Sequence, residues 1–197
     1  MLHKANQRLR NLVTGISASP TDVEGLWVIE RAPIEDSRGS FCRLFEPSVF
    51  EEWGWDGPVR QINHSCTAQR GAVRGMHFQL PPHDETKLVT CLAGEVYDVA
   101  VDLRRGSPTF LSVFGTHLSA NNRKSLLIPR GFAHGFQALI ENVELLYLHD
   151  RDYAPTHEGG LLPTDPRLGI DWPIPISQMS ERDLTHKPIE DDFEGID

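Results

Sequence analysis

Short apolar runs separated by turn-forming residues dominate this chain from Val23 onward. Gly, Pro, Asp and Asn stand between the runs, so none extends far enough to be a long helix. Many short strands at this spacing are typical of a β-sandwich or β-barrel. The runs cover residues 26–29, 59–63, 72–79, 87–92, 96–102, 110–118, 125–128 and 143–148. The sequence therefore predicts an all-β fold, and we favour a jelly-roll barrel.

Local signals add two short helices and one hairpin to this barrel. Residues 46–53 have Pro47 near the start and acidic residues in the first turns, which indicates a helix. A second helix is expected to begin at Ser180, because residues 180–183 have the form of a capping box. Gly94 supplies the positive φ of a tight turn, so we expect the strands on either side of residues 93–94 to pair.

The length of the chain fits one domain with a substantial core, because 197 residues bury a large fraction of their surface. Residues 1–21 mix Lys, Arg, Asn and Ser with few bulky apolar groups, and we interpret them as a loosely ordered or partner-docked arm. Residues 22–197 are expected to form the single domain.

The charge balance excludes some classes of protein. Lys and Arg number 19 against 28 Asp and Glu, a net charge of -9, which argues against a general nucleic-acid or membrane-surface binder. An anionic ligand would need a local basic cluster. No stretch approaches the roughly 20 apolar residues of a membrane span. Three widely spaced cysteines, Cys42, Cys66 and Cys91, are expected to be reduced, which predicts a cytoplasmic protein.

A histidine and a lysine on neighbouring strand-like runs are the first candidates for chemistry. Alternation places His77 on one face with Val73 and Gln79, whereas Arg74 nominally points the other way, and a bulge at Gly75 would bring both inward. Taken alone, a single histidine is more often a hydrogen-bonded core residue than a base. Lys87, taken alone, is more often solvated.

Three further polar residues fall within apolar runs. Asp98 needs a partner if it points inward, because an unpaired buried carboxylate is costly. Tyr147 is more often a core residue than a catalyst at such a position, yet its hydroxyl also needs a partner when buried. His134 follows a Pro-Arg-Gly turn, a position at which barrels of this kind can bind a metal. Against a metal, His77 is not followed by the second histidine of the usual metal-binding motif.

Taken in order, these segments resemble the dTDP-4-dehydrorhamnose 3,5-epimerases, sugar-nucleotide epimerases of the cupin superfamily. The resemblance covers roughly residues 23–183 and implies that 22–197 is a cupin-type epimerase domain. The stretches that carry it are Asp36-Ser37-Arg38-Gly39, Gln61-Ile62-Asn63-His64-Ser65, residues 73–79, Lys87-Leu88-Val89, residues 94–104, Ser107-Pro108-Thr109-Phe110, residues 128–136 and residues 165–173.

The resemblance implies a reaction and a role for each matching residue. His77 would remove the proton beside the C4 ketone of a 4-keto-6-deoxy sugar, Tyr147 would return one from the opposite side, Asp183 would orient His77, and Lys87 would stabilise the enolate. The resemblance implies no cofactor and no metal. It also implies a homodimer in which N-terminal strands cross between the subunits. Contacts to the nucleotide sugar are expected from Arg38, Arg43, Gln61, Asn63, Arg74, Asp98, His134, Glu158 and Arg182.

The chain departs from the family pattern where the nucleotide and the sugar would lie. Arg43 and Ile62 stand where many members carry acidic residues, Asp152 replaces an aromatic residue, and Pro163 replaces a frequent Trp. The favoured reaction converts dTDP-4-dehydro-6-deoxyglucose to dTDP-4-dehydrorhamnose. A GDP- or CDP-linked sugar, or inversion at C3 or C5 alone, stays open.

Two other classes of protein also fit the pattern. One is a metal-dependent cupin enzyme that uses His77, His83 and His134. The other is a sugar-nucleotide binding protein without catalysis, against which the complete acid-base set argues.

Overall fold

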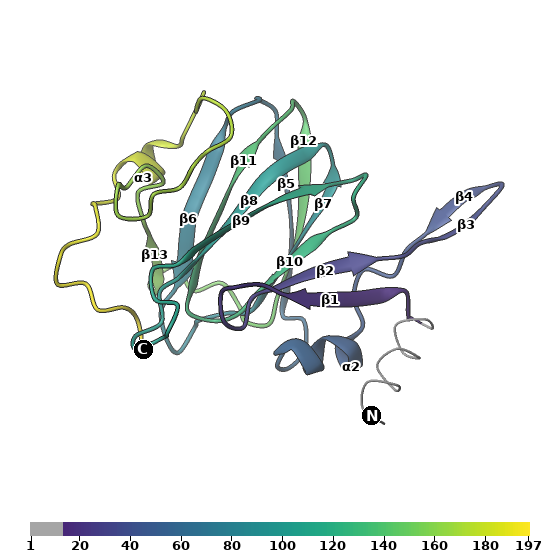
Figure 1. Ribbon diagram of the computed structural model, residues 1–197, viewed down its shortest axis with the longest axis horizontal. Coiled ribbons are helices and arrows are strands. Elements are labelled where there is room, and N and C mark those ends of the chain that lie inside the picture. The colour runs from purple at the N-terminus through teal and green to yellow at the C-terminus, as the bar shows by residue number, and fades with distance from the viewer. Residues whose placement is uncertain (1–13) are drawn as a thin grey trace.

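Two antiparallel sheets stacked face to face form the body of the protein (Figure 1). The computed structural model describes residues 14–197. Strands from distant parts of the sequence are neighbours in both sheets, so the predicted all-β jelly roll with short peripheral helices is confirmed. Among the described residues, none of the helices has the length and apolar character needed to cross a membrane.

The first sheet has six strands in the order β1, β2, β10, β7, β12, β5. All neighbouring pairs run antiparallel. Their bounds, in that order, are Ile16–Pro20, Trp27–Arg31, Ser125–Ile128, Lys87–Ala93, Val143–His149 and Gln61–Thr67.

The second sheet has five strands in the order β13, β6, β11, β8, β9, and it is also antiparallel. Their bounds are Glu158–Gly160, Val73–Gln79, Phe132–Ala138, Glu95–Asp102 and Val113–Ser119. The remaining elements are the hairpin strands β3 and β4, the helix α2, the 3-10 helix η1 and the helix α3, with bounds Ile34–Asp36, Gly39–Phe41, Pro47–Phe50, Glu51–Trp53 and Glu181–Leu184.

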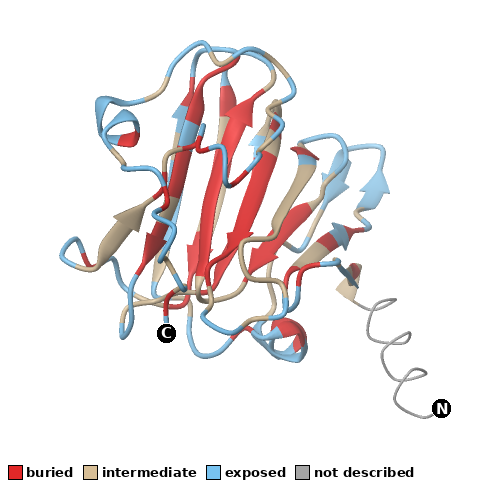
Figure 2. Ribbon diagram, turned by 60° about the vertical axis from the view of Figure 1, so that its left-hand side comes forward, coloured by how far each residue is buried: buried red, intermediate tan, exposed pale blue. Residues whose placement is uncertain are grey.

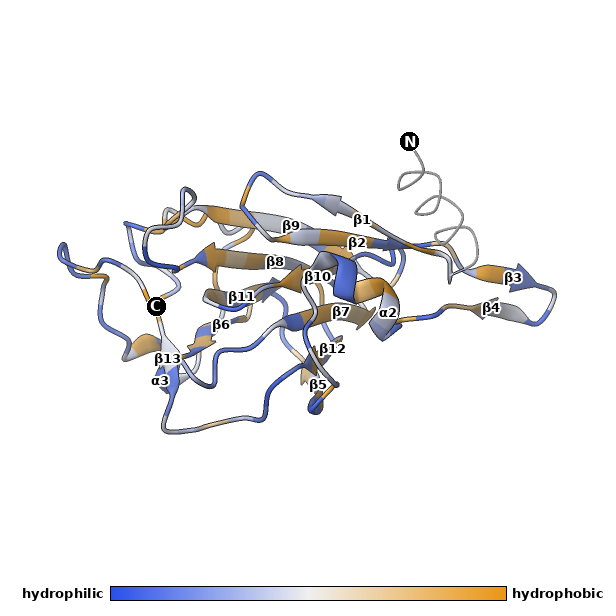
Figure 3. Ribbon diagram, turned by 90° about the horizontal axis from the view of Figure 1, so that it is seen from below, coloured by the Kyte–Doolittle hydropathy of each residue, from blue (hydrophilic) through white to orange (hydrophobic). Residues whose placement is uncertain are grey.

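The apolar core between the sheets follows from strand alternation. Val96 and Ala100 of β8 face Val89 of β7 and Leu145 of β12 across the interior, and all four are fully buried. Tyr97 and Val99, which alternate with them, face outward. Figure 2 shows the central strands buried along most of their length. In Figure 3 the hydrophobic colour follows strands such as β8, whereas the connecting loops are mostly hydrophilic.

Both outer faces are also covered, each by a different part of the chain. On the six-stranded sheet, Phe50 and Trp53 of α2 and η1 pack against Leu88 of β7. On the five-stranded sheet, Leu168 and Ile189 of the C-terminal segment pack against residues such as Val99. Because β8 is covered on both sides, it reads as a nearly continuous apolar run in the sequence.

The predicted hairpin at residues 93–94 is wrong. Gly94 has the expected positive φ of 81°, but the chain there passes from one sheet to the other. Strand β7 pairs with β10 and β12, whereas β8 pairs with β9 and β11. The turn signal was correct and the pairing was not, because a glycine turn can join two strands of one sheet or lead from one sheet to the facing one.

The two predicted helices are confirmed. Residues 47–53 form α2 and η1, with Pro47 as the first helical residue. Ser180 is the N-cap of α3, and its hydroxyl accepts a hydrogen bond from the backbone N–H of Asp183 at 3.1 Å.

The N-terminal part of the chain contributes to the six-stranded sheet. The predicted arm covered residues 1–21, but Ile16–Pro20 forms β1 and pairs with β2. Residues 1–13 of the predicted arm lie outside the described residues. The hairpin of β3 and β4 follows soon after, and it projects away from the two sheets (Figure 1). All of its strand residues are exposed.

Candidate active site

One end of the barrel interior is polar and hollow. The core described above fills the other end, and the cavity has a volume of about 270 Å³. Side chains from both sheets line it. The predicted residues among them are Gln61, Asn63, Arg74, His77, Lys87, His134, Tyr147 and Glu158.

A bulge in β6 brings Arg74 and His77 into the same cavity. In the pairing with β11, His77 stands opposite His134 and Arg74 opposite Phe136, so β6 holds one extra residue. The bulge is at Gly75, which has a φ of 120° and whose Cβ would lie 2.5 Å from Cα of Gly135. Only glycine allows this approach. The predicted bulge is therefore confirmed.

His77 forms a hydrogen-bonded pair with Asp183. Its Nε2 lies 2.7 Å from Oδ1 of Asp183, whose side chain is only 4% exposed. Burial lowers the pKa of His77, while the Asp183 carboxylate acts in the opposite direction. The carboxylate holds the ring as the tautomer with hydrogen on Nε2, which leaves Nδ1 to accept a proton. The pair has the geometry of an oriented general base.

Lys87 belongs to a buried trio of titratable side chains. Its Nζ lies 3.0 Å from Oε1 of Glu85, and Nδ1 of His149 lies 3.3 Å from Oε2, near enough for an ion pair although not aligned for a hydrogen bond. Each of the three side chains is 10% exposed or less. Burial alone would raise the pKa of Glu85, but Lys87 and His149 outweigh it and lower that pKa to about 2.

Tyr147 faces the cavity from β12, in the sheet opposite His77. Burial raises the pKa of its hydroxyl above the usual value. Ser65 donates a hydrogen bond of 3.4 Å to that hydroxyl, and the ring stacks against His149 at 6.2 Å between centroids. A neutral phenol is therefore held as a proton donor on the wall opposite the base.

Asp98 points inward and has the partner it requires. Its Oδ2 lies 2.9 Å from Nε2 of His134, and the carboxylate is fully buried. Among the described residues, His77, His83 and His134 do not come together as a group of possible metal ligands; His134 lies against Asp98, and the rings of His83 and His157 pack with their centroids 4.3 Å apart.

Glu158 links three elements at the cavity mouth. Its Oε1 lies 2.7 Å from a guanidinium nitrogen of Arg182, and its Oε2 accepts a 2.5 Å hydrogen bond from the hydroxyl of Tyr153. Arg182 therefore lies beside the cavity rather than in its lining. Asp152 points away and pairs with Arg60 at 2.7 Å.

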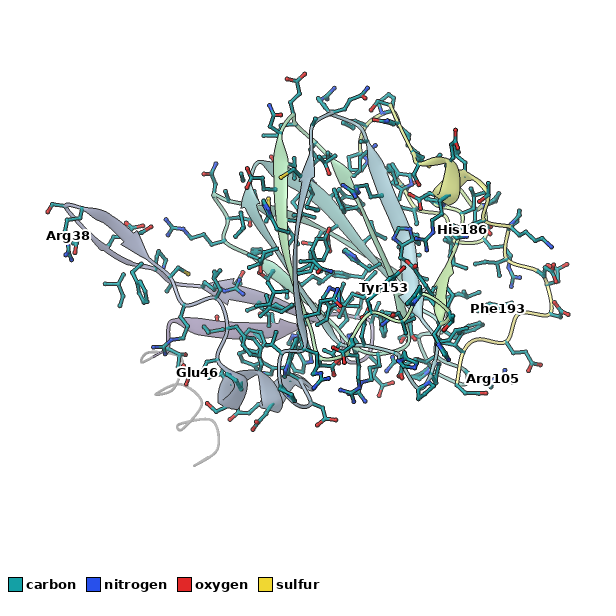
Figure 4. The ribbon with its side chains drawn as sticks, turned by 180° about the vertical axis from the view of Figure 1, so that it is seen from behind. Arg38, Glu46, Arg105, Tyr153, His186 and Phe193 are labelled. Carbon is teal, nitrogen blue, oxygen red and sulfur yellow. The ribbon has the colours of Figure 1, made fainter. Side chains whose placement is uncertain are left out.

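Arg38 and Arg43 lie away from this cavity. Arg38 sits in the projecting hairpin with a side chain 88% exposed, and it pairs with Asp36. Figure 4 shows it far from Tyr153 and His186, which lie over the barrel. Arg43 pairs with Glu46 at 2.6 Å. Within one chain, the two arginines do not meet the other predicted contacts, because the hairpin extends away from its own barrel.

Comparison with known proteins decides the family. The model of the dTDP-4-dehydrorhamnose 3,5-epimerase family matches residues 20–191. The chain belongs to this family. A dTDP-4-dehydrorhamnose 3,5-epimerase of Shigella flexneri is 41% identical over 83% of this chain and 91% of that protein. A dTDP-4-dehydrorhamnose 3-epimerase of Streptomyces niveus is 40% identical over 83% of this chain and 79% of that protein.

Solved structures of the epimerases share the fold as well as the sequence. A dTDP-6-deoxy-D-glucose-3,5-epimerase of Legionella pneumophila, in complex with dTDP-4-keto-L-rhamnose, superposes with a TM-score of 0.83 at 39% identity, covering 88% of this chain and 92% of that one. The predicted family, the cupin-type fold and the isomerase class are thereby confirmed.

Sequence reasoning missed several residues of the epimerase cavity. Glu85 and His149 line it together with Ser65, Gln79 and Tyr153. The signal for one of them was present, because His149 stands two positions after Tyr147 in β12, whereas Glu85 precedes β7. Strand alternation places residues two apart on the same face.

Proposed function

We propose that this protein inverts C3 and C5 of dTDP-4-dehydro-6-deoxyglucose to give dTDP-4-dehydrorhamnose, with no cofactor. The observation that carries the proposal is the placement of a base and an acid on facing walls of one cavity. His77 projects from β6 in the five-stranded sheet, and Tyr147 from β12 in the six-stranded sheet. A sugar ring between them is exposed to a proton acceptor on one face and a proton donor on the other.

The chemistry requires only these side chains. His77 takes the proton from the carbon beside the C4 ketone, which leaves an enolate. The cation of Lys87, buried beside Glu85, stabilises the negative oxygen in a cavity with little water. Tyr147 then gives its proton to the opposite face of the carbon, and the configuration is inverted. Each inversion leaves His77 protonated and Tyr147 ionised, so solvent must restore both.

The nucleotide is proposed to be dTDP because relatives that match most of the chain are named for dTDP sugars. The guanidinium of Arg74 offers donors for the diphosphate at the wall of the cavity. Arg43, Ile62 and Asp152 differ from the residues that many family members carry at these positions. For this reason the experiment below also compares sugars linked to other nucleotides. Inversion at C3 alone is the second candidate, because Asp152 stands in place of an aromatic residue and pairs with Arg60.

We propose that the enzyme acts as a cytoplasmic homodimer in which each hairpin reaches the partner's cavity. Ile34 and Phe41 of the hairpin are 72% and 66% exposed, which is unusual for large apolar side chains without a covering surface. Such an arrangement would bring Arg38 to a cavity that it does not reach in its own chain. All three cysteines are free, which fits a reducing compartment.

Proton NMR in D₂O tests the proposal. The purified protein is given dTDP-4-keto-6-deoxyglucose, beside the GDP- and CDP-linked sugars. Loss of the C3 and C5 proton signals with the dTDP sugar is the expected result, and His77→Ala should abolish it while nucleotide binding persists. Loss at C3 alone would favour the second candidate. No exchange with any of the sugars would overturn the assignment.

A further inference from the structure

A second histidine stands beside the His77 and Asp183 pair and has no part in the proposed reaction. His186 lies just after the C-cap of α3, so this short helix and the turn that follows present Asp183 and His186 together. The rings of His77 and His186 meet edge to face, with centroids 6.4 Å apart. One nitrogen from each histidine and one oxygen of Asp183 lie within 4.8 Å of one another.

The backbone makes room for this histidine. Gly160 of β13 stands opposite His77 in the strand pairing. A Cβ on Gly160 would overlap the imidazole of His186, with Nε2 as the nearest atom. The φ of Gly160 is not in the left-handed region, so the space that glycine leaves, rather than its conformational freedom, explains why it is compatible with this packing.

The Nε2 atom of His186 is buried and has no hydrogen-bond partner among residues 14–197. A buried polar nitrogen without a partner is costly, so such an atom in a native protein calls for an explanation. A ligand that bonds to it would remove this cost. The nearby polar atoms are a second imidazole and a carboxylate, which share with Nε2 the capacity to bind a cation.

We propose that His77, Asp183 and His186 form a site for a divalent transition metal ion, and that its occupation stops the epimerase. Two imidazole nitrogens and one carboxylate oxygen are a donor set that zinc and iron prefer, with further positions left for water. Donors around one Zn²⁺ lie about 3 to 4 Å apart, so small side-chain rotations would close the site. This metal is an inhibitor of the reaction and not a cofactor.

Inhibition follows from the atom that the metal would occupy. Binding to Nε2 of His77 displaces the hydrogen that now bonds to Asp183, and that proton leaves to solvent. The positive ion then withdraws electrons from the ring and weakens Nδ1 as a base. Metal binding itself is independent of the proposed function, whereas the inhibition rests on it.

An ion can reach two of the three ligands from a second hollow of about 500 Å³, which is lined by His77 and Asp183 together with Gln178, Ser180 and Arg182. The charge of Arg182 would oppose a cation, but its ion pair with Glu158 offsets that charge. Figure 4 shows His186 near the C-terminal segment, on the side of the barrel opposite the projecting hairpin.

Metal titrations of the full chain test the site. Wild type, stripped with a chelator, is titrated with Zn²⁺ by calorimetry and with Co²⁺ by visible absorption. His186→Ala and His186→Gln remove the ligand, and the glutamine variant keeps much of the side-chain volume over Gly160. His64→Ala is the matched control, because His64, Cys66 and Glu144 form the other cluster of possible ligands within the described part of the chain, at an exposed position.

We expect both His186 variants to lose Zn²⁺ affinity by at least about tenfold. Proton exchange without metal should persist in them, and Zn²⁺ should inhibit wild type and His64→Ala but spare the His186 variants. Equal inhibition of all forms, relief of inhibition by His64→Ala, or absence of binding at micromolar Zn²⁺ would each overturn the proposal. If wild type shows no exchange with any sugar, the proposed function fails while the Co²⁺ spectra still decide the metal site.

Discussion

At the residue scale, the roles of Tyr147 and His77 can be tested separately, because the two side chains enter the cavity from opposite sheets. Tyr147→Phe removes the hydroxyl and keeps the ring that packs against His134 and His149. His77 would still remove a proton and return a deuteron to the same face. We expect exchange in D₂O to persist while net inversion falls roughly 100-fold. NMR measures both rates in one sample, and an equal loss of both would contradict the assigned role.

Glu85 gives a prediction about stability and pH. Its pKa is lowered from 4.5 to about 2 in the folded protein, so its contribution is complete above pH 4.5 and is lost as the pH falls toward 2. The shift corresponds to about 3 kcal/mol. Urea unfolding should therefore show Glu85→Gln destabilised by about this amount at pH 7, with the difference from wild type shrinking in acid. A difference that stays constant between pH 5 and pH 2 would argue against the stabilisation of the Glu85 carboxylate by Lys87 and His149.

The residues of the site differ in how far the sequence revealed them. Alternation and the family resemblance both marked His77, whereas the roles of Lys87 and Tyr147 came from the resemblance, because a single lysine is more often solvated and a tyrosine in an apolar strand more often belongs to the core. Asp183 came from the resemblance alone, since it lies in a helix of four residues at a separation of 106 positions from His77. No periodic pattern connects such distant positions. His186 was missed for the same reason, because it is also far from His77 in the sequence and belongs to no motif.

At the scale of elements, the bulge in β6 is the feature on which the site depends most. A Cβ at Gly75 would meet backbone atoms of Gly135 and His134, which cannot move aside like a flexible side chain. Gly75→Ala should therefore shift the pairing of β6 with β11 and turn Arg74 or His77 out of the cavity. We expect destabilisation by roughly 2 kcal/mol or more and loss of most exchange activity.

The Gly75→Ala effect has two causes, the positive φ of the residue and the close approach of β6 and β11, and Gly106→Ala separates them. Gly106 also has a positive φ, of 72°, but nothing lies within 4 Å of its Cβ position. It should show only the backbone cost of about 1 kcal/mol and retain activity. Urea unfolding and proton exchange are measured for both variants. Equal behaviour of the two would mean that the close approach of β6 and β11 does not hold the site.

Strand positions were easier to predict than strand partners. The apolar runs at residues 87–92 and 96–102 became β7 and β8, but these strands belong to different sheets. Partner choice is a property of the whole barrel, where both faces of β8 are covered and a local turn signal carries no information about sheets. The short strands β3, β4 and β13 have no buried residue, so no apolar run marked them.

At the scale of the whole molecule, the projecting hairpin requires a second copy if Arg38 is to meet the substrate. Two variants that we expect to be inactive, His77→Ala and Arg38→Ala, can be co-expressed to test this. Random pairing makes half of the dimers hybrid, and each hybrid holds one cavity with an intact His77 and an intact Arg38 from the partner. Exchange activity should therefore return to about a quarter of the wild-type value, since one of two sites is restored in half of the dimers.

The same mixture distinguishes the opposite arrangement. If Arg38 served the cavity of its own chain, every site in every hybrid would carry one lesion, and no activity would return. Separately purified variants, mixed without unfolding, are the control, because subunits that do not exchange should stay inactive. Recovery in the co-expressed sample alone would place the hairpin over the partner's barrel and explain why Ile34 and Phe41 are exposed in the single chain.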